Sequence, residues 1–355
     1  MANDRLAIDH VTDLEVRRGG TWDRRGFVKS VAALTASAGL LGYDLRAARA
    51  EPPPETTRFR IAQGPFICYA PQMVAEELLR LEGFTDVQYV KVPPNYTYAT
   101  LVASGGVDLA VFGPPSAVVA VDAGNPIVML AGLHVGCWEL FANERVRGVP
   151  DLKGKTIAVI GMGAVDQLWL ASILSYVGMD PSKDVNWLPA QKLSETMRLF
   201  VEGKADAFLG FPPQPQDLRA KKIGHVIVNI TQDRPWSQYF CCIVVARRGF
   251  AHEYPSATKR ALRAFLKAAD ICAQEPERAA RYLVAKGYEP RYEIGLEVLK
   301  SLPYSRWREA SAEDSLRFHA LRLHEAGLIK STPEQIIARG SDWRFLNELK
   351  KELKA

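Results

Sequence analysis

The sequence LVASGGVDLAVFGPP at 101–115 returns in altered form as LFVEGKADAFLGFPP at 199–213, which lies 98 residues further along the chain. The two stretches keep a Leu, a Gly, an Asp and a Pro-Pro pair at the same spacing, without a gap. The same offset places the apolar run at 59–62 on the run at 157–160. A repeated order of apolar runs and turns indicates a duplicated structural unit, so the chain is predicted to contain one unit twice.

Each unit alternates short β-rich runs with stretches of helical spacing. In the first unit we expect strands at 59–63, 87–92, 108–112 and 127–131, and helices at 71–81, 98–104 and 116–123. After the second unit a β-branched run at 240–246 precedes mainly helical segments at 255–274, 277–286, 312–326, 333–338 and 343–353. Alternating strands and helices imply parallel strands covered by helices. The prediction is an α/β fold of two lobes, each a mostly parallel sheet flanked by helices, with two hinge crossings between them.

The predicted domain boundaries follow from this reading. Residues 1–50 form a leader and 51–57 a Pro-rich tether. Lobe 1 takes 58–136, lobe 2 takes 137–246, and the chain returns to lobe 1 with its C-terminal helices at 247–355.

The leader has the order of an export signal. Arg24 and Arg25 precede Gly-Phe-Val-Lys, an uncharged stretch follows at 31–43, and a small-x-small site ends at Ala50. The adjacent arginines resemble a twin-arginine signal, with an ordinary secretory signal or an amphipathic N-terminal helix as the alternatives. The uncharged stretch is too short for a permanent membrane helix. We expect export to the periplasm and cleavage near Ala50.

Composition and charge exclude several classes of protein. Hydrophobic residues make up 48% and charged residues 24% of the chain, which is typical of globular proteins. The net charge of +5 is scattered, so a nucleic-acid partner is not expected. The five cysteines show no CxxC spacing, so neither a zinc site nor a disulfide framework is indicated, and we expect no metal or cofactor. A bridge from Cys137 to Cys241 or Cys242 is conceivable in an oxidising compartment, although buried free thiols are favoured.

Four stretches resemble a known family: DLAVFGPPS at 108–116, VPDLKGKTIAVIGMG at 149–163, the repeat at 199–213, and GSDWRFLNEL at 340–349. With them the chain resembles the type II periplasmic solute-binding proteins of ABC importers, and more narrowly the nitrate, sulfonate, taurine and thiamine-pyrimidine-precursor binding family. The resemblance implies a monomer that captures a small organic or oxyanionic ligand between its lobes. The captured ligand would pass to a membrane ABC permease, which works with a cytoplasmic ATPase.

The ligand is expected at the carboxyl ends of the strands, where loop amides and helix N-termini meet. Glycines of a turn resembling the family's ligand loop, aromatic residues on the expected rims, and polar side chains beside them make up the candidate set: Gln63, Phe66, Tyr69, Asn95, Tyr96, Gly113, Ser116, His134, Trp138, Gly161, Gly163, Ala164, Asp166 and Trp236. The rims offer few cations, and Asp166 near a helix start disfavours a strongly anionic ligand. Aromatic faces suit a planar or apolar-bodied ligand.

Two alternatives to a transport protein stay open at this point. One is an enzyme, a lyase or hydrolase, on the same fold, because fold alone does not fix function. Its only candidate acid–base pair is His134 with Asp166, and the six histidines show no HExxH spacing, so no catalytic residue is assigned. The other is a sensor that presents its ligand-bound form to a membrane receptor.

Overall fold

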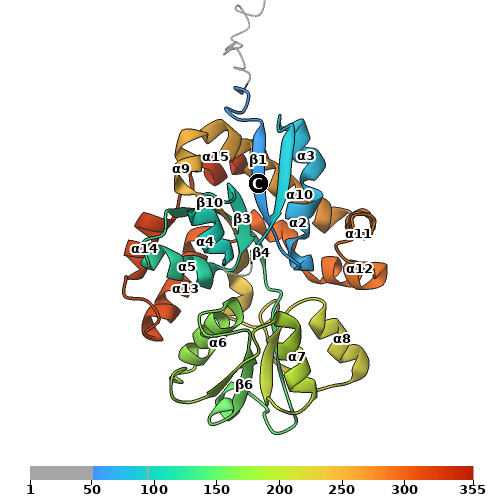
Figure 1. Ribbon diagram of the computed structural model, residues 1–355, viewed down its shortest axis with the longest axis vertical. Helices are drawn as coiled ribbons and strands as arrows, with labels where there is room; N and C mark the ends of the chain where they lie inside the picture. The colour runs from blue at the N-terminus through green and yellow to red at the C-terminus, as the bar shows by residue number, and fades with distance from the viewer. Residues whose placement is uncertain (1–50, 94–95, 355) are drawn as a thin grey trace, which may run out of the picture. The chain divides into compact units, whose positions relative to one another are not determined.

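The computed structural model describes residues 51–93 and 96–354. The expected signal, with Arg24, Arg25 and Ala50, lies outside the described residues, as does Asn95. The described chain forms two five-stranded sheets, one in each lobe, with strand orders β2-β1-β3-β10-β4 and β7-β6-β8-β5-β9 (Figure 1). Among the helices of the described residues, none combines the length and apolar character that a membrane crossing requires.

The sheet of lobe 1 contains β1 (Arg58–Gln63), β2 (Asp86–Lys91), β3 (Leu109–Phe112), β4 (Ile127–Val135) and β10 (Phe240–Arg247). Strand β1 runs parallel to β2 and β3, whereas β10 runs antiparallel to β3 and β4. The short elements that connect the first four strands are η1 (Ile67–Tyr69), α2 (Ala70–Val74), α3 (Glu76–Leu81), α4 (Tyr98–Ala103) and α5 (Pro114–Asp122).

The sheet of lobe 2 repeats this plan with β5 (Glu139–Ala142), β6 (Thr156–Val159), β7 (Asn186–Pro189), β8 (Ala207–Gly210) and β9 (His225–Asn229). Strand β6 is parallel to β7 and β8, and β5 is antiparallel to β8 and β9. The connecting helices are η2 (Val149–Leu152), α6 (Val165–Tyr176), α7 (Leu193–Val201) and α8 (Gln214–Lys221). Each lobe therefore has one antiparallel strand in an otherwise parallel sheet.

Two crossings join the lobes, one at 136–138 between β4 and β5, and one at 230–239 between β9 and β10. The second crossing contains η3 (Trp236–Gln238). The predicted end of lobe 2 at residue 246 is wrong, because β10 pairs with β3 and β4 in the sheet of lobe 1. An apolar β-branched run reads the same whichever sheet it joins, so the sequence pattern does not fix its partner.

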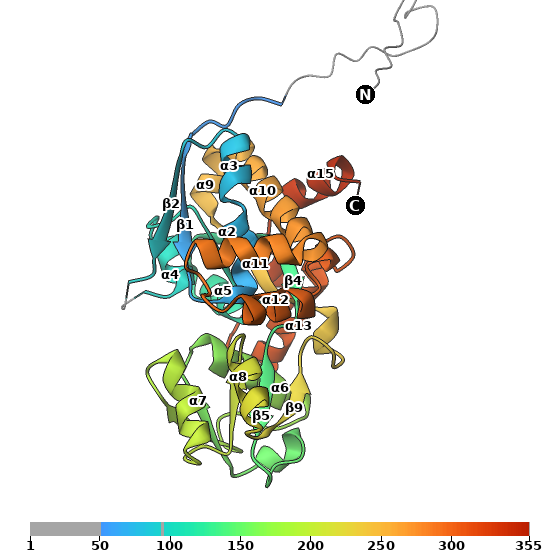
Figure 2. The same cartoon turned by 90° about the vertical axis from the view of Figure 1, so that its right-hand side faces the viewer.

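After β10 the chain is helical, with α9 (Arg248–Glu253), α10 (Pro255–Gln274), α11 (Pro276–Ala285), α12 (Tyr292–Ser301), η4 (Tyr304–Trp307), α13 (Ala312–Glu325), α14 (Pro333–Gly340) and α15 (Arg344–Glu352). Helix α10 packs against α2 and α3, and α11 lies beside α12 (Figure 2). Helix α13 contacts both α5 of lobe 1 and α6 of lobe 2. The return helices therefore cover lobe 1, and α13 and α12 also contact lobe 2.

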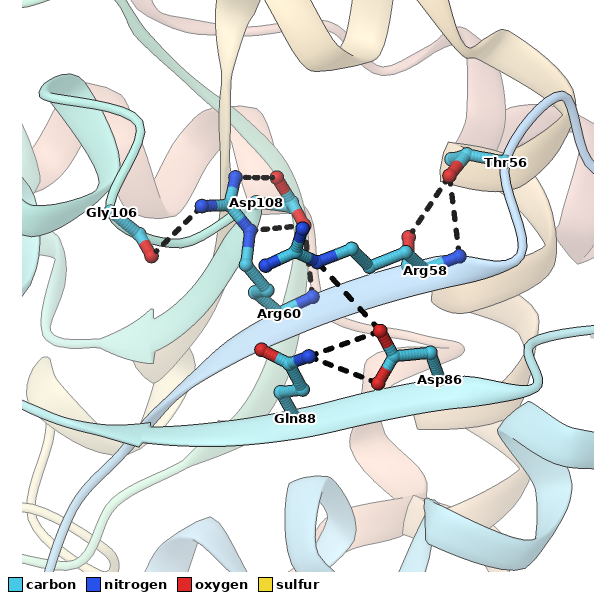
Figure 3. Close-up of polar contacts among 7 residues, drawn as sticks. All are labelled: Thr56, Arg58, Arg60, Asp86, Gln88, Gly106 and Asp108. Atoms are coloured by element: carbon cyan, nitrogen blue, oxygen red, sulfur yellow. Dashed lines mark hydrogen bonds and ion pairs between the residues drawn. The ribbon is translucent and has the colours of Figure 1, made fainter.

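The duplication is visible in an equivalent aspartate of each lobe, Asp108 before β3 and Asp206 before β8. The Asp108 Oδ2 accepts the backbone N–H of Arg60 at 2.8 Å (Figure 3). In lobe 2 the Asp206 Oδ2 accepts the backbone N–H of Thr156 at 3.0 Å. The backbone N–H groups of both aspartates donate back to the same two residues. Arg60 in β1 and Thr156 in β6 are thus equivalent residues, and they lie 96 positions apart. The two aspartates lie 98 positions apart, so the spacing between the repeated units is two residues shorter at β1 and β6 than at the aspartates.

Candidate functional site

A cavity of about 450 Å³ lies where the two lobes meet. Residues after the carboxyl ends of β1, β2 and β3 line it from lobe 1, and residues after β6 and β8 line it from lobe 2. Its lining also includes residues of the first crossing and of β10. The whole set is Phe66, Cys68, Tyr69, Val92, Tyr96, Thr97, Tyr98, Ala99, Thr100, Phe112, Gly113, Ser116, Val119, Ala120, Ala123, Asn125, Cys137, Trp138, Ile160, Gly163, Ala164, Val165, Leu168, Phe211, Cys241 and Cys242. The cavity therefore lies at the edge where ligands of open α/β sheets bind.

Two helix N-termini border the cavity, one from each lobe. Helix α5 follows the N-cap Gly113 and opens with two prolines, which have the fixed φ of a first helical turn and need no N–H partner there. Helix α6 follows Gly163, whose φ of +76° lies in the left-handed region that favours glycine. The Gly163 N–H donates to the Gln167 Oε1 at 3.1 Å, which holds the turn against its own helix. The first turn of a helix leaves N–H groups without an intrahelical partner, but Pro114 and Pro115 have none, so α6 offers more such donors here than α5.

Aromatic rings form the walls. Phe66 of lobe 1 and Phe211 of lobe 2 meet edge to face with ring centroids 4.7 Å apart. Trp138 of the first crossing lies 5.3 Å from the same Phe211 ring. Tyr69 packs on Phe66 at 5.0 Å. These contacts make a continuous aromatic surface that includes residues of both lobes.

The described lining residues include no Asp, Glu, Lys, Arg or His. Its polar groups are hydroxyls, one amide side chain and thiols, for example Ser116, Thr97 and Asn125. Burial raises the pKa of the Tyr69 and Tyr98 phenols above the usual value, so both remain neutral hydrogen-bond donors at physiological pH. The cavity is suited to an uncharged apolar body carrying a few hydrogen-bonding groups.

Eight of the fourteen predicted ligand residues line this cavity: Phe66, Tyr69, Tyr96, Gly113, Ser116, Trp138, Gly163 and Ala164. Asn95 lies outside the described residues, and the structure places the other five away from the lining. Gln63 is the last residue of β1, and Gly161 begins the turn before α6 with no neighbouring atom within 4 Å of an added Cβ. His134 is fully buried near the end of β4.

The Asp166 carboxylate does not line the cavity; it accepts hydrogen bonds that connect the start of α6 to the end of β6. Its Oδ2 accepts the Ile160 N–H at 2.7 Å and its Oδ1 accepts the Gln167 N–H at 2.9 Å. Burial raises the pKa of this carboxyl to about 6, against hydrogen bonds that favour the ionised form. The expectation that Asp166 repels an anionic ligand therefore loses its geometric basis.

Trp236 packs outside the cavity, although it flanks a crossing as Trp138 does. Its ring lies 5.5 Å from that of Tyr176 and 5.2 Å from that of Phe318, in the contact between α6 and α13. Another tryptophan, Trp169 of α6 in lobe 2, was not among the residues predicted from the sequence, and it packs beside Gly113 of lobe 1. A Cβ at position 113 would lie 3.1 Å from the Trp169 Nε1. Because glycine has no side chain, α6 can pack closely against this part of lobe 1.

Ion pairs hold the lobes together at a separate place. The Arg291 Nη1 lies 2.7 Å from the Asp217 Oδ1, which joins the segment before α12 to α8 of lobe 2. The buried carboxylate of Glu289 accepts a hydrogen bond from the Arg291 Nε at 3.0 Å. Together with Asp217, it raises the pKa of the Arg291 guanidinium above its usual value. A second pair, Arg219 with Glu297, spans 3.6 Å between the same two helices. Sequence spacing gave no signal for these contacts, because the partners lie in different lobes.

Sequence reasoning anticipated only part of the floor of the cavity, because it brought Cys137 near Cys241 and Cys242 but left out Cys68. Four cysteines line it, namely Cys68, Cys137, Cys241 and Cys242. All five cysteines of the chain are free and buried. Cys68 belongs to a rim segment, Cys137 to the first crossing, and Cys241 and Cys242 to the start of β10, so their positions along the sheet edge could have suggested that all four converge.

A scan of protein families and a search of curated proteins each give one match that bears on the chain. Residues 52–286 match the model of the NMT1-like family. A Bacillus subtilis (strain 168) protein named as a binding protein, YtlA, is 27% identical over 177 residues, which cover 47% of this chain and 52% of YtlA. The chain therefore spans about half the length of that curated relative.

Solved structures share the fold. The periplasmic nitrate-binding protein NrtA from Synechocystis PCC 6803 superposes with a TM-score of 0.70 at 17% identity, covering 85% of this chain and 90% of NrtA. The periplasmic aliphatic sulphonate binding protein SsuA from Escherichia coli gives a TM-score of 0.63 at 18% identity, covering 79% of this chain and 96% of SsuA. The predicted two-lobed periplasmic-binding-protein fold is confirmed. These relatives are, by their names, binding proteins and not enzymes.

Proposed function

The chain belongs to the NMT1-like family, and from this premise we propose that it is the exported solute-binding component of an ABC importer. It captures a small molecule between its lobes and delivers it to a membrane permease that works with a cytoplasmic ATPase. The export signal expected at 1–50 would bring it to the periplasm, with cleavage near Ala50. The observation that carries the proposal is one cavity lined by both lobes at the carboxyl ends of their strands.

The proposed ligand is an uncharged or weakly polar molecule with a planar, aromatic-sized body. Aromatic faces such as Phe66, Trp138 and Phe211 suit such a body, and the described lining residues offer no cation to a nitrate or a sulfonate. The first turn of α6 supplies backbone N–H groups that can bind one carbonyl or other polar oxygen of the ligand, whereas α5 opens with two prolines. The oxyanions named for NrtA and SsuA are therefore not the ligands proposed for this chain.

Capture follows from the way the lobes meet. In the proposed mechanism the lobes rotate about the two crossings, and contacts from both sides, such as Phe66 with Phe211, form when the lobes approach. A ligand that touches both walls binds this arrangement more tightly than an open one, and so raises its population. The ligand-bound arrangement is the form that docks on the permease. A membrane receptor in place of the permease is the alternative partner.

The enzyme alternative has little support in the site. Its two acid–base candidates lie in different lobes. Asp166 accepts hydrogen bonds from backbone N–H groups of lobe 2, and His134 is buried near the end of β4 in lobe 1. Neither lines the cavity. General acid–base catalysis requires both groups within hydrogen-bond reach of one substrate.

A thermal-shift panel tests the proposed function. The purified chain is heated with neutral aromatic amides and phenols, pyrimidines, benzoate, nitrate and taurine in parallel. A ligand at 100 times its dissociation constant adds about 2.7 kcal/mol of stability, which raises the Tm by several degrees. We expect shifts with neutral aromatic compounds and none with nitrate or taurine. Shifts with nitrate or taurine alone would overturn the proposed ligand class, and no shift with any compound would remove the support for a binding protein of this kind.

A further inference from the structure

Three thiols and an imidazole converge beneath the aromatic cavity. The ligand-capable atoms of Cys68, His134, Cys137 and Cys242 all lie within 4.8 Å of one another, and all four residues are buried. They come from η1, from β4, from the first crossing and from β10. Segments far apart in the sequence thus place four metal-ligating groups at one point of the hinge.

His134 is poised as a ligand through one ring nitrogen. Its Nδ1 lies 3.3 Å from the Val135 backbone oxygen, which can only accept, so this contact favours the tautomer that carries the proton on Nδ1. Its Nε2 is then a bare lone pair, and it is buried without a hydrogen-bond partner. A buried polar atom of this kind is costly unless something binds it. A metal-bound histidine in proteins shows this arrangement, with the second nitrogen donating to a backbone carbonyl.

The backbone conformation of Cys137 is a second sign of a binding site at this position. Its φ is 141°, in a region that residues other than glycine rarely adopt. Such strain costs on the order of 1–3 kcal/mol and persists where the surroundings determine the conformation, as they do around bound ligands. The conformation brings the Cys137 Sγ to within 3.0 Å of the Cys241 Sγ as well. Cys241 can then donate its S–H to a Cys137 thiolate.

We propose that Cys68, Cys137, Cys242 and the Nε2 of His134 bind one Zn²⁺ ion at the floor of the cavity. Three cysteines with one histidine are an established ligand set of four-coordinate zinc. Zinc–sulfur bonds of about 2.3 Å and zinc–nitrogen bonds of about 2.0 Å bring tetrahedral ligand atoms to roughly 3.5–3.8 Å from one another. A set that lies within 4.8 Å reaches this size by small side-chain movements.

Binding exchanges protons for the metal ion. The three thiols lose three protons to solvent as three zinc–sulfur bonds form, and the neutral imidazole supplies the fourth bond. The resulting centre carries one negative charge, and the neighbouring Cys241 S–H offers it a hydrogen bond. Because the four ligands fill the coordination sphere, the centre is structural. It joins η1, which carries Tyr69 of the ligand wall, to β4, to the first crossing and to β10.

A disulfide is the competing use of these thiols. A bond between Cys137 and Cys241 would shorten their 3.0 Å separation to about 2.05 Å. It would take Cys137 out of the set and leave the Nε2 of His134 without a partner. The zinc site accounts for both residues, and therefore explains more of the geometry.

Metal titration of the full chain tests the proposal. The chain is purified anaerobically without a metal-affinity step, treated with a chelator, and titrated with Zn²⁺ against a chromophoric competitor. We expect one ion per chain, a raised Tm, and affinity more than about 100-fold weaker in Cys68→Ser and Cys242→Ser. Cys272→Ser is the matched control, because Cys272 is equally buried but lies in α10 outside the set, and it should bind zinc as the unmodified chain does.

A second readout uses the unmutated chain, so that misfolded variants do not decide the matter. Co²⁺ in place of Zn²⁺ should give the intense near-ultraviolet bands of cobalt–thiolate bonds and the visible bands of a tetrahedral ion. Absence of stoichiometric zinc binding, a cobalt spectrum without thiolate bands, binding of Cu⁺ but not Zn²⁺, or a Cys137–Cys241 disulfide in the anaerobically purified chain would each overturn the proposal. Failure of the organic ligand panel would leave this result unaffected, since the zinc titration requires no organic ligand.

Discussion

The Sγ atoms of Cys137 and Cys241 lie 3.0 Å apart, although the two residues are separated by 104 positions. Cys137 belongs to the crossing that leaves lobe 1, and Cys241 to the strand β10 that returns to it. The contact therefore fixes where the two connections between the lobes approach each other. It also sets the base of the cavity, because both residues line it.

The first prediction concerns the oxidation state of these thiols. In the metal-free chain, burial raises the pKa of Cys137 and of Cys241, so both stay protonated and react slowly with oxidants. We expect all five cysteines of the chain to be alkylated after unfolding with a chelator but without reductant. Intact-mass spectrometry counts the adducts. Three adducts, with a crosslinked peptide containing residues 137 and 241, would contradict the prediction.

The second prediction concerns Gly113, where the two lobes come closest to one another beside α6. A valine there would place carbon atoms against the Trp169 Nε1 and the Val165 Cγ2, which are already 3.1 and 3.4 Å from an ideal Cβ. We expect Gly113→Val to keep α6 from approaching and to weaken ligand binding by at least about tenfold, or 1.4 kcal/mol. Isothermal titration measures the loss. Gly161→Ala is the control, because a Cβ at position 161 would meet no atom within 4 Å. Equal losses of affinity in both variants would contradict the prediction.

The third prediction concerns the ion pair between Arg291 and Asp217. Both side chains are partly exposed, so the pair contributes at most about 1 kcal/mol. Arg291→Ala should speed ligand release by up to about fivefold, and added salt should reduce the difference. Stopped-flow fluorescence follows the release. Arg317→Ala removes a comparable pair with Glu334 inside lobe 1 and should leave the release rate unchanged. Equal rates in all three proteins would show that the pair does not restrain the lobes.

The fourth prediction is a pH dependence that arises at Asp166. Burial raises its pKa from 3.8 to about 6 in the folded chain, so between these values the native state holds a proton that the unfolded state has lost. Stability from this group is therefore complete below pH 3.8 and falls as the pH rises toward 6. The free energy of unfolding, measured relative to Asp166→Asn, should drop by about 3 kcal/mol or less across that interval. Urea unfolding at several pH values checks it, and a difference that rises with pH would contradict it.

Much of the fold could be predicted from the sequence, because its signals are local. The helix expected at 255–274 has the bounds of α10, where proline begins the helix and an amphipathic pattern runs to Gln274. Strands β3 and β8 keep the offset of 98, since each follows an aspartate that binds the neighbouring strand. The helix expected at 71–81 breaks at Ala75 into α2 and α3. Neither Gly nor a following Pro marks that break, so the local pattern did not reveal it.

The site could be predicted only in part, because side-chain direction depends on contacts between lobes. The rule of strand carboxyl ends located the right loops, and Phe66, Tyr69 and Ser116 line the cavity as a result. Trp138 and Trp236 both flank crossings, and only the packing of α13 shows that Trp236 faces Phe318. The sequence brought Cys137 near Cys241 and Cys242, but it did not reveal that Cys68 and His134 join this group, because these residues share no sequence motif. Their convergence depends on β10 entering the sheet of lobe 1, where the sequence reading had placed it in lobe 2.

The measurement that tests the central claim most directly is a comparison of two tryptophan variants by isothermal titration with the neutral aromatic compound that stabilises the protein most. Trp138 lines the cavity between the lobes, whereas Trp236 packs outside it against Tyr176 and Phe318. We predict that Trp138→Ala weakens binding by about 10- to 100-fold, as expected for the loss of 1.5–3 kcal/mol of buried aromatic contact, and that Trp236→Ala binds as the unmodified protein does. Unchanged affinity in Trp138→Ala, or a larger loss in Trp236→Ala, would contradict capture of an aromatic ligand in this cavity.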